Sequence, residues 1–339
     1  MDIIIPPAGL VPAPPIPQPN IYPLEWRVNT TKLAELYERS KRAVWNPADF
    51  PWNDLRAEDF TPEQRIGIMY WYAVLANFDG SGPPVFAQAT VHSFEEHAED
   101  PIRKCFFSIT RDEMNHEECC QRVIQKLVPG GPLDFNPQTP LERAAKNNIE
   151  WLYHNGGRYW TGYVKSLGKY PLSVLFTSFM MGEVAASTLF FGMSKKATHP
   201  VFQQIFKKVG RDEARHLAIC LAILETDFPG LKEEDRELIT KQLRAGFVFL
   251  SMILWEPPQQ FWELTDYFLP NHRVLLKHAR DAGLGCLSYD EQAENWRNAL
   301  AKVRAIVGEW GIAFPAIPEL DLDGVDVGHI SAEDIIPVF

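Results

Sequence analysis

The chain has 339 residues, of which 46% are hydrophobic and 23% charged, a composition typical of a globular protein with a sizeable core. Its 33 Lys and Arg residues against 44 Asp and Glu residues give a formal net charge of −11, and no basic stripe stands out. Nucleic acid is therefore not expected as a partner. Apolar runs stay below the roughly 18 residues that a membrane span needs.

The five cysteines form no Cys-x-x-Cys pair, so neither a disulfide framework nor a thiolate zinc site is indicated. The start of the chain is rich in proline and lacks both the basic region and the unbroken apolar region of a secretory signal. We therefore expect a cytoplasmic protein with reduced cysteines.

Three segments follow one another along the chain. Prolines crowd residues 1–28 and predict an extended arm, because proline cannot continue a helix. Residues 29–311 show helical periodicity without a Ser/Gly-rich or charged linker, which predicts a single domain. Residues 312–339 return to Pro, Gly and Asp and predict an irregular tail.

Capping residues, apolar periodicity and Pro or Gly at the junctions predict long helices. Thr61, Pro62 and Gln64 form one such helix start. The expected ranges are 30–42, 61–79, 84–98, 101–128, 139–166, 170–197, 199–226, 232–255, 259–268, 272–282 and 290–311. Strand-like alternation is hard to find, so the predicted fold class is all-α, an elongated bundle with additional helices.

A duplicated hexapeptide carries the strongest functional signal. Arg111-Asp112-Glu113-Met114-Asn115-His116 recurs 100 residues later as Arg211-Asp212-Glu213-Ala214-Arg215-His216. A Glu and a His three residues apart lie on one face of a helix, so each copy can offer a carboxylate oxygen and an imidazole nitrogen to a metal ion. Two copies therefore predict a site for two metal ions.

A bundle site of this kind also needs a carboxylate from each of two further helices. Glu183 lies in a run without any other charge, where an ionised carboxylate would be costly to bury without a cation. In the first half, Asp79 lies 34 residues before Glu113, next to Gly-Ser-Gly-Pro-Pro and hence at a helix end or kink. Gln88 is the next candidate, and the sequence leaves open whether Asp79, Gln88 or neither completes the first-half ligand set.

These residues resemble the ferritin-like di-iron carboxylate oxygenases. Glu99-Asp100-Pro101-Ile102-Arg103-Lys104, together with the first Glu-x-x-His copy, is most similar to the p-aminobenzoate N-oxygenase branch. The segment from Trp45 to Trp52 resembles the approach to the bundle in acyl-carrier-protein desaturases. The resemblance covers roughly residues 61–226 and implies a ferritin-like bundle.

The resemblance also implies roles for the site residues. Glu113 and Glu213 would bridge two iron ions, with manganese as an alternative metal. His116 and His216 would each bind one ion, and Asp79 and Glu183 would be terminal carboxylates. Iron is preferred because all these donors are oxygen or nitrogen.

Three further residues are expected to support the ligands. Asp112 and Asp212 could accept a hydrogen bond from an imidazole and so orient it. Ser187, one turn beyond Glu183, could assist proton delivery, although a hydroxyl in a helix often bonds to its own backbone instead.

At two positions the sequence differs from these families, and each difference argues against one possible function. Val209 stands where the N-oxygenase branch has an additional histidine, which argues against arylamine N-oxygenation as such. Cys120 stands where ribonucleotide reductase small subunits have their radical tyrosine, which argues against radical storage.

The leading hypothesis is an O2-dependent oxygenase or oxidase that acts on a small or medium organic substrate by hydroxylation, N-oxygenation, desaturation or oxidative cleavage. Its electrons would come from a ferredoxin or reductase, and a homodimer is the expected assembly. A first alternative is a desaturase or hydroxylase of a carrier-protein-bound acyl or aminoacyl group, with a docking patch from Arg103, Lys104, Lys207, Lys208 and Arg211. A second is a non-catalytic ferritin-like iron-binding protein.

Overall fold

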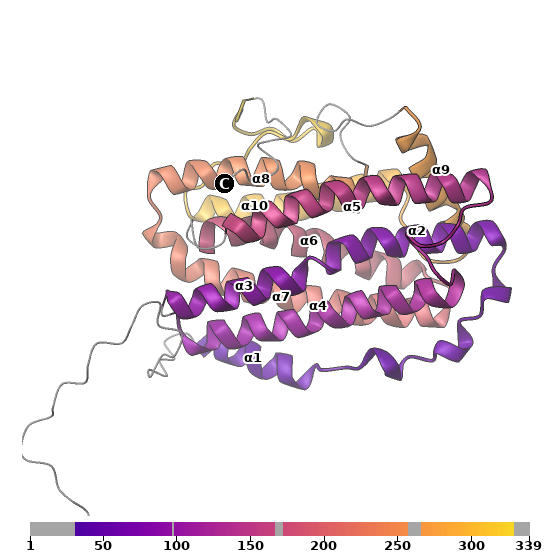
Figure 1. Cartoon of the computed structure of the whole chain (residues 1–339). Helices are drawn as coiled ribbons and strands as arrows, with labels where there is room; N and C mark the ends of the chain where they lie inside the picture. The colour runs from indigo at the N-terminus through magenta and orange to yellow at the C-terminus, as the bar shows by residue number, and fades with distance from the viewer. Residues whose placement is uncertain (1–30, 97, 167–171, 257–265, 329–339) are drawn as a thin grey trace, which may run out of the picture.

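The computed structural model describes residues 31–96, 98–166, 172–256 and 266–328, and the fold in this part is all-α, as predicted (Figure 1). Short 3-10 turns connect some of the helices. The helices are α1 Thr31–Arg42, α2 Pro62–Asp79, α3 Gly82–Glu95, α4 Asp100–Leu127, α5 Pro140–Ser166, α6 Leu172–Lys196, α7 Pro200–Asp227, α8 Glu233–Leu254, α9 Phe268–Asp281 and α10 Tyr289–Glu309.

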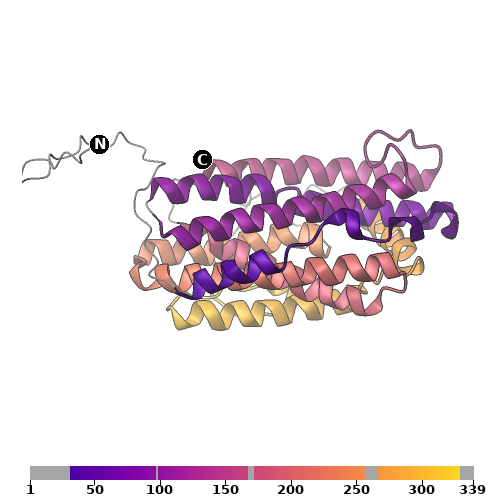
Figure 2. The same cartoon turned by 90° about the horizontal axis from the view of Figure 1, so that it is seen from below.

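The long helices run nearly along one axis and enclose a single core (Figure 1). Helix α4 packs against α2 and α3, while α6 packs against α7, and α4 also contacts α7. Helices α5, α8, α9 and α10 cover this inner set, and α1 lies along α4 and α7 on the outside (Figure 2). The inner helices are therefore the ones that can present side chains to a common interior point.

Helices α2 and α3 follow each other directly and are separated only by a break at Gly80 and Ser81. The two prolines that follow Gly82 remove backbone donors, so the helix cannot run through this point. A Cβ on Gly82 would lie 2.5 Å from Cγ of Glu113. Glycine at this position therefore allows α3 to approach the side chain of Glu113 closely.

Most helix ends lie within a few residues of the predicted ones, because capping side chains mark them. The Thr61 hydroxyl accepts a hydrogen bond from the Gln64 backbone N–H, and Oε1 of Gln64 accepts one from the Thr61 backbone N–H. The expected start at residue 272 was wrong, since α9 begins at Phe268. Pro270 lies in the first turn, where a missing N–H costs nothing. The helix expected at 259–268 lies mostly outside the described residues.

Residues 312–328 have no helix longer than one 3-10 turn, but they pack on the bundle. Phe314, Ile317 and Leu320 are buried, and Glu319 forms a bidentate ion pair with Arg244 at 2.7 and 2.8 Å. The arm expected at residues 1–28 and the end of the tail lie outside the described part of the chain. None of the described helices is long and apolar enough to cross a membrane.

Candidate metal centre

The two hexapeptide copies occupy equivalent places on α4 and α7. Glu113 and His116 lie one turn apart on α4, Glu213 and His216 lie one turn apart on α7, and all four side chains are buried. Helices that present an apolar face to each other bring such positions together. The structure therefore places both predicted Glu-x-x-His pairs at one interior point, although they are 100 residues apart in sequence.

Asp79 and Glu183 complete two overlapping groups of potential ligands. Asp79, at the last residue of α2, joins Glu113, His116 and Glu213, and the facing atoms of these four residues lie within 4.8 Å of one another. Glu183 of α6 joins Glu113, Glu213 and His216 within the same limit. The two glutamates of the repeat belong to both groups, which is the arrangement of two carboxylates shared between two ions.

Both imidazoles turn Nδ1 toward the carboxylates. Nδ1 of His116 lies 3.3 Å from Oε1 of Glu213 and 3.6 Å from Oε2 of Glu113. Nδ1 of His216 lies 3.1 Å from Oε1 of Glu113, 3.3 Å from Oε2 of Glu213 and 3.7 Å from Oε2 of Glu183. Two carboxylate oxygens thus lie close to Nδ1 of His116, and three lie close to Nδ1 of His216.

The inward-facing atoms have no hydrogen-bond partner among the described residues. They are Oδ1 of Asp79, Nδ1 of His116, Oε2 of Glu183, both carboxylate oxygens of Glu213 and Nδ1 of His216. Buried charged groups left in this state are costly unless they are paired or coordinate a metal. Four carboxylates, when all are ionised, would carry four negative charges, which two divalent cations would balance. The donor set therefore fits a dinuclear centre.

Burial and mutual repulsion shift the protonation of these carboxyl groups. Burial raises the pKa of Asp79 and of Glu183 well above their ordinary values, and the neighbouring glutamate charges add to the effect. Burial opposes ionisation of Glu213 too, but the neighbouring imidazoles of His116 and His216 outweigh it and hold the pKa of Glu213 well below the usual range. A cation between these carboxylates would relieve the repulsion.

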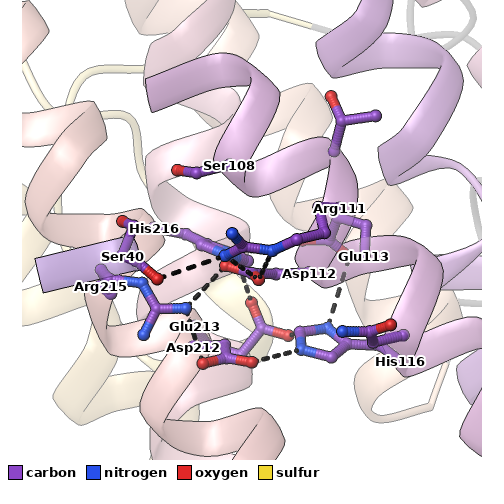
Figure 3. A network of polar contacts seen from close by, with 12 residues as sticks. Ser40, Ser108, Arg111, Asp112, Glu113, His116, Asp212, Glu213, Arg215 and His216 are labelled. Carbon is purple, nitrogen blue, oxygen red and sulfur yellow. Dashed lines mark hydrogen bonds and ion pairs between the residues drawn. The ribbon is translucent and has the colours of Figure 1, made fainter. Parts of the chain in front are cut away.

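The two aspartates of the repeat cross over between the helices (Figure 3). Asp212 of α7 lies 3.2 Å from Nε2 of His116 on α4, whereas Asp112 of α4 lies 3.4 Å from Nε2 of His216 on α7. Each aspartate therefore contacts the histidine of the other copy. Such contacts fix the orientation of the imidazole and leave Nδ1 to face the cluster.

Arg215 connects the two aspartates and was not anticipated as a site residue. Its Nη2 donates to Oδ2 of Asp112 at 2.6 Å and to Oδ1 of Asp212 at 2.7 Å, and Arg111 donates to Oδ1 of Asp112 (Figure 3). Burial opposes ionisation of both aspartates, but the histidines and Arg215 outweigh it and lower their pKa. Its role could have been suspected from the sequence, because the two copies of the hexapeptide differ at this position, with Asn115 in one and Arg215 in the other.

Trp45 is a second residue that sequence reasoning did not assign to the site. Its indole Nε1 donates to Oδ2 of Asp212 at 2.7 Å, and its ring stacks on His116 with centroids 6.1 Å apart. Asn115 donates to the Trp45 backbone oxygen at 3.1 Å and so holds the segment before α2 against α4.

The remaining predicted residues have other surroundings. The Ser187 side chain is buried, and its hydroxyl donates to the Val184 backbone oxygen at 3.1 Å. This is the hydrogen bond to its own helix backbone that was given as the alternative to proton delivery. Gln88 lies on α3 and is half-buried. Between the two first-half alternatives, the structure places Asp79 in the cluster.

The fold is similar to that of known metalloproteins. Three structures of R2-like ligand-binding oxidase match the chain, two of them variants with an aerobically reconstituted Mn/Fe cofactor and one with its metal cofactor after photoconversion. Their identities are 17%, 17% and 18%, and their TM-scores 0.56, 0.57 and 0.56. The matches cover 84% of this chain and 94% to 98% of the others.

The chain shares the ferritin-like fold of these oxidases. The fold class expected from the sequence is thereby confirmed. No protein-family model matches the sequence, and no curated protein is significantly similar to it. At this identity the likeness concerns the fold, so the chemistry has to be argued from the buried cluster itself.

Proposed function

We propose that the protein is a di-metal oxidoreductase that uses O2 to oxidise a small or medium organic substrate. The observation that carries this proposal is the pair of ligand groups that share Glu113 and Glu213. Glu113 and Glu213 would be shared by the two ions, His116 and Asp79 would hold one of them, and His216 and Glu183 would hold the other. When bound, the ions supply the electrons that activate O2.

The protein residues position and insulate this centre. Asp212 and Asp112 contact Nε2 of the imidazoles, and Phe106 and Phe179 are buried on α4 and α6, the helices that carry Glu113 and Glu183, with Phe86 buried on α3. Their rings contact one another, with Phe86 and Phe179 at 4.9 Å and Phe86 and Phe106 at 6.3 Å. An apolar lining limits access of water, which suppresses side reactions of a strong oxidant.

Iron is the metal that we propose, with manganese as the alternative. Carboxylate and imidazole donors without thiolates suit both. R2-like ligand-binding oxidase, which has the same fold, holds a Mn/Fe cofactor. External electrons would come from a partner such as a ferredoxin or reductase.

Carrier-protein docking is less well supported than a small-molecule substrate. Arg103, expected in the basic patch, is buried with its guanidinium 4.7 Å from the Phe94 ring centroid. Lys104 pairs with Asp100 at 2.5 Å. Two members of the patch are therefore engaged within the chain. The similarity to the N-oxygenase and desaturase branches remains a hypothesis about the type of reaction.

Elemental analysis with O2 consumption tests the proposal. The purified protein reconstituted with iron should hold about two ions per chain, and Glu183→Ala and His216→Ala should lose metal. Glu225→Ala is the matched control, because Glu225 lies on α7 like His216 but pairs with Lys32 at the surface. Full metal content in both site variants would refute the centre. Uptake of many irons per chain would support the storage alternative instead.

A further inference from the structure

A cavity of about 520 Å³ lies beside the break between α2 and α3. Gly80 and Glu117 are among its lining residues, and they directly follow Asp79 and His116 in sequence. Further walls come from α5 and from the segment after α4. Two parts of the cavity wall are therefore built by residues that are next in sequence to members of the cluster.

A much smaller apolar pocket, of about 10 Å³, shares Trp160 with this cavity. Phe78 and Gly182 line it, and they directly precede Asp79 and Glu183. Trp160 lines both the cavity and this pocket, and its ring lies 5.8 Å from that of Phe179. The two pockets thus share Trp160, and the smaller one is lined by the sequence neighbours of Asp79 and Glu183.

The charged residues that line the 520 Å³ cavity favour a positively charged ligand over a negatively charged one. Two carboxylates line it, those of Glu117 and Asp134, while no Lys, Arg or His is present among its lining residues in the described part of the chain. A carboxylate or phosphate would meet no cation there. A protonated amine would meet the Glu117 carboxylate and the face of Trp160, both of which attract cations.

We propose that this cavity binds the substrate of the centre and that the substrate is an apolar molecule carrying a protonated amine. In this proposal Glu117 pairs with the amine, and the apolar body lies against Trp160. This inference rests on the proposed function, because the bound molecule is a substrate only if the metal centre oxidises it. Binding itself is tested without turnover.

Calorimetric titration of the manganese-loaded protein with three probes of similar size tests the charge preference. The probes are phenethylamine, phenethyl alcohol and hydrocinnamate, which carry a cation, a neutral hydroxyl and an anion. Phenethylamine should bind at least about tenfold more tightly than hydrocinnamate, the ratio that about 1.4 kcal/mol produces. Equal affinities, or tighter binding of the anion, would overturn the proposal.

Two variants locate the binding. A Cβ on Gly157 would meet no atom within 4 Å, and Gly157 lines the cavity, so Gly157→Leu should fill it and lower the phenethylamine affinity about tenfold or more. Gly308→Leu makes the same change at an equally open position on α10 and should leave the affinity unchanged. Glu117→Gln should reduce the amine preference over the alcohol. Unchanged binding in Gly157→Leu, or an unchanged preference in Glu117→Gln, would place recognition elsewhere.

Metal content separates this inference from the proposed function. Two ions per chain without amine preference would overturn the cavity assignment and leave the di-metal centre intact. Amine binding that Gly157→Leu removes, in a protein that takes up no metal, would confirm the cavity as an amine site and overturn its role as the substrate site of an oxidase.

Discussion

At the scale of single residues, Arg215 is the side chain whose loss should matter most outside the ligands. It bridges two buried aspartates from α4 and α7. Arg215→Gln should lower the free energy of unfolding by about 3 kcal/mol, because it leaves two buried carboxylates facing each other without their shared cation. Urea unfolding of the metal-free variant measures this.

The matched control is Arg122→Gln. Arg122 pairs with Glu118 on the surface of α4, with side chains 40% and 42% exposed, so its loss should cost less than about 1 kcal/mol. Similar losses in the two variants would show that the bridge between the aspartates contributes little to stability.

The potential metal ligands could be predicted from the sequence. The residues that hydrogen-bond to the two histidines could not. The spacing within Glu-x-x-His places both side chains on one helix face whatever the tertiary structure, and the isolated charge of Glu183 marks a buried partner. The crossing of Asp112 to His216 depends on how α4 and α7 are rotated against each other. Trp45 reaches Asp212 across 167 positions of sequence, and no local pattern encodes that contact.

At the scale of elements, neighbouring glycines of α5 should respond in opposite ways to alanine. A Cβ at Gly156 would lie 2.4 Å from Oδ1 of Asn77, whose amide donates to the Leu152 oxygen, so Gly156→Ala should destabilise the protein by about 1 to 2 kcal/mol. A Cβ at Gly157 would enter open space, so Gly157→Ala should stabilise by up to about 1 kcal/mol through helix propensity. Thermal unfolding compares the two, and the same sign of change in both would contradict the α2–α5 packing.

The contact between α2 and α9 should depend on pH. His272 is buried against Tyr70, with the hydroxyl 2.6 Å from Nδ1, and burial lowers the pKa of His272 from 6.5 to about 4. Between these values the unfolded chain binds a proton that the folded protein does not, so stability falls as pH falls through this window. The total effect is up to about 3 kcal/mol.

His272→Asn provides the measurement for that pH dependence. Between pH 6.5 and 4.5, the unfolding free energy of the variant should fall less steeply than that of the unchanged protein, by up to about 1.4 kcal/mol per pH unit. Other groups titrate in both proteins and cancel in the difference. Parallel curves would show that the pKa of His272 is the same in the folded and the unfolded state.

Helix positions were predictable from the sequence because caps and prolines act locally. The Thr61 capping box and the Ser288 cap of α10 mark their helix starts without reference to any other element. The start of α9 was misjudged because Pro270 can either end a helix or occupy its first turn, and packing of Phe268 on Trp151 decides between the two. Ring centroids of that pair lie 4.6 Å apart.

At the scale of the whole molecule, the centre connects α2, α4, α6 and α7, so metal binding should stabilise the bundle as one unit. Each ion at a hundredfold excess over its dissociation constant adds about 2.7 kcal/mol to the unfolding free energy. Because Glu213 belongs to both ligand groups and Asp79 to one, Glu213→Gln should lose both ions, whereas Asp79→Asn should retain about one.

Calorimetry and elemental analysis of the same samples separate these cases. Metal should raise the unfolding temperature most in the unchanged protein, less in Asp79→Asn and not at all in Glu213→Gln. The order follows from the sharing of carboxylates, since a bridging ligand that is lost leaves both ions with incomplete coordination. Retention of about one ion in Glu213→Gln as well would mean that Glu213 serves only one of the ions, and the shared-carboxylate arrangement on which the proposed oxidation chemistry depends would then be wrong.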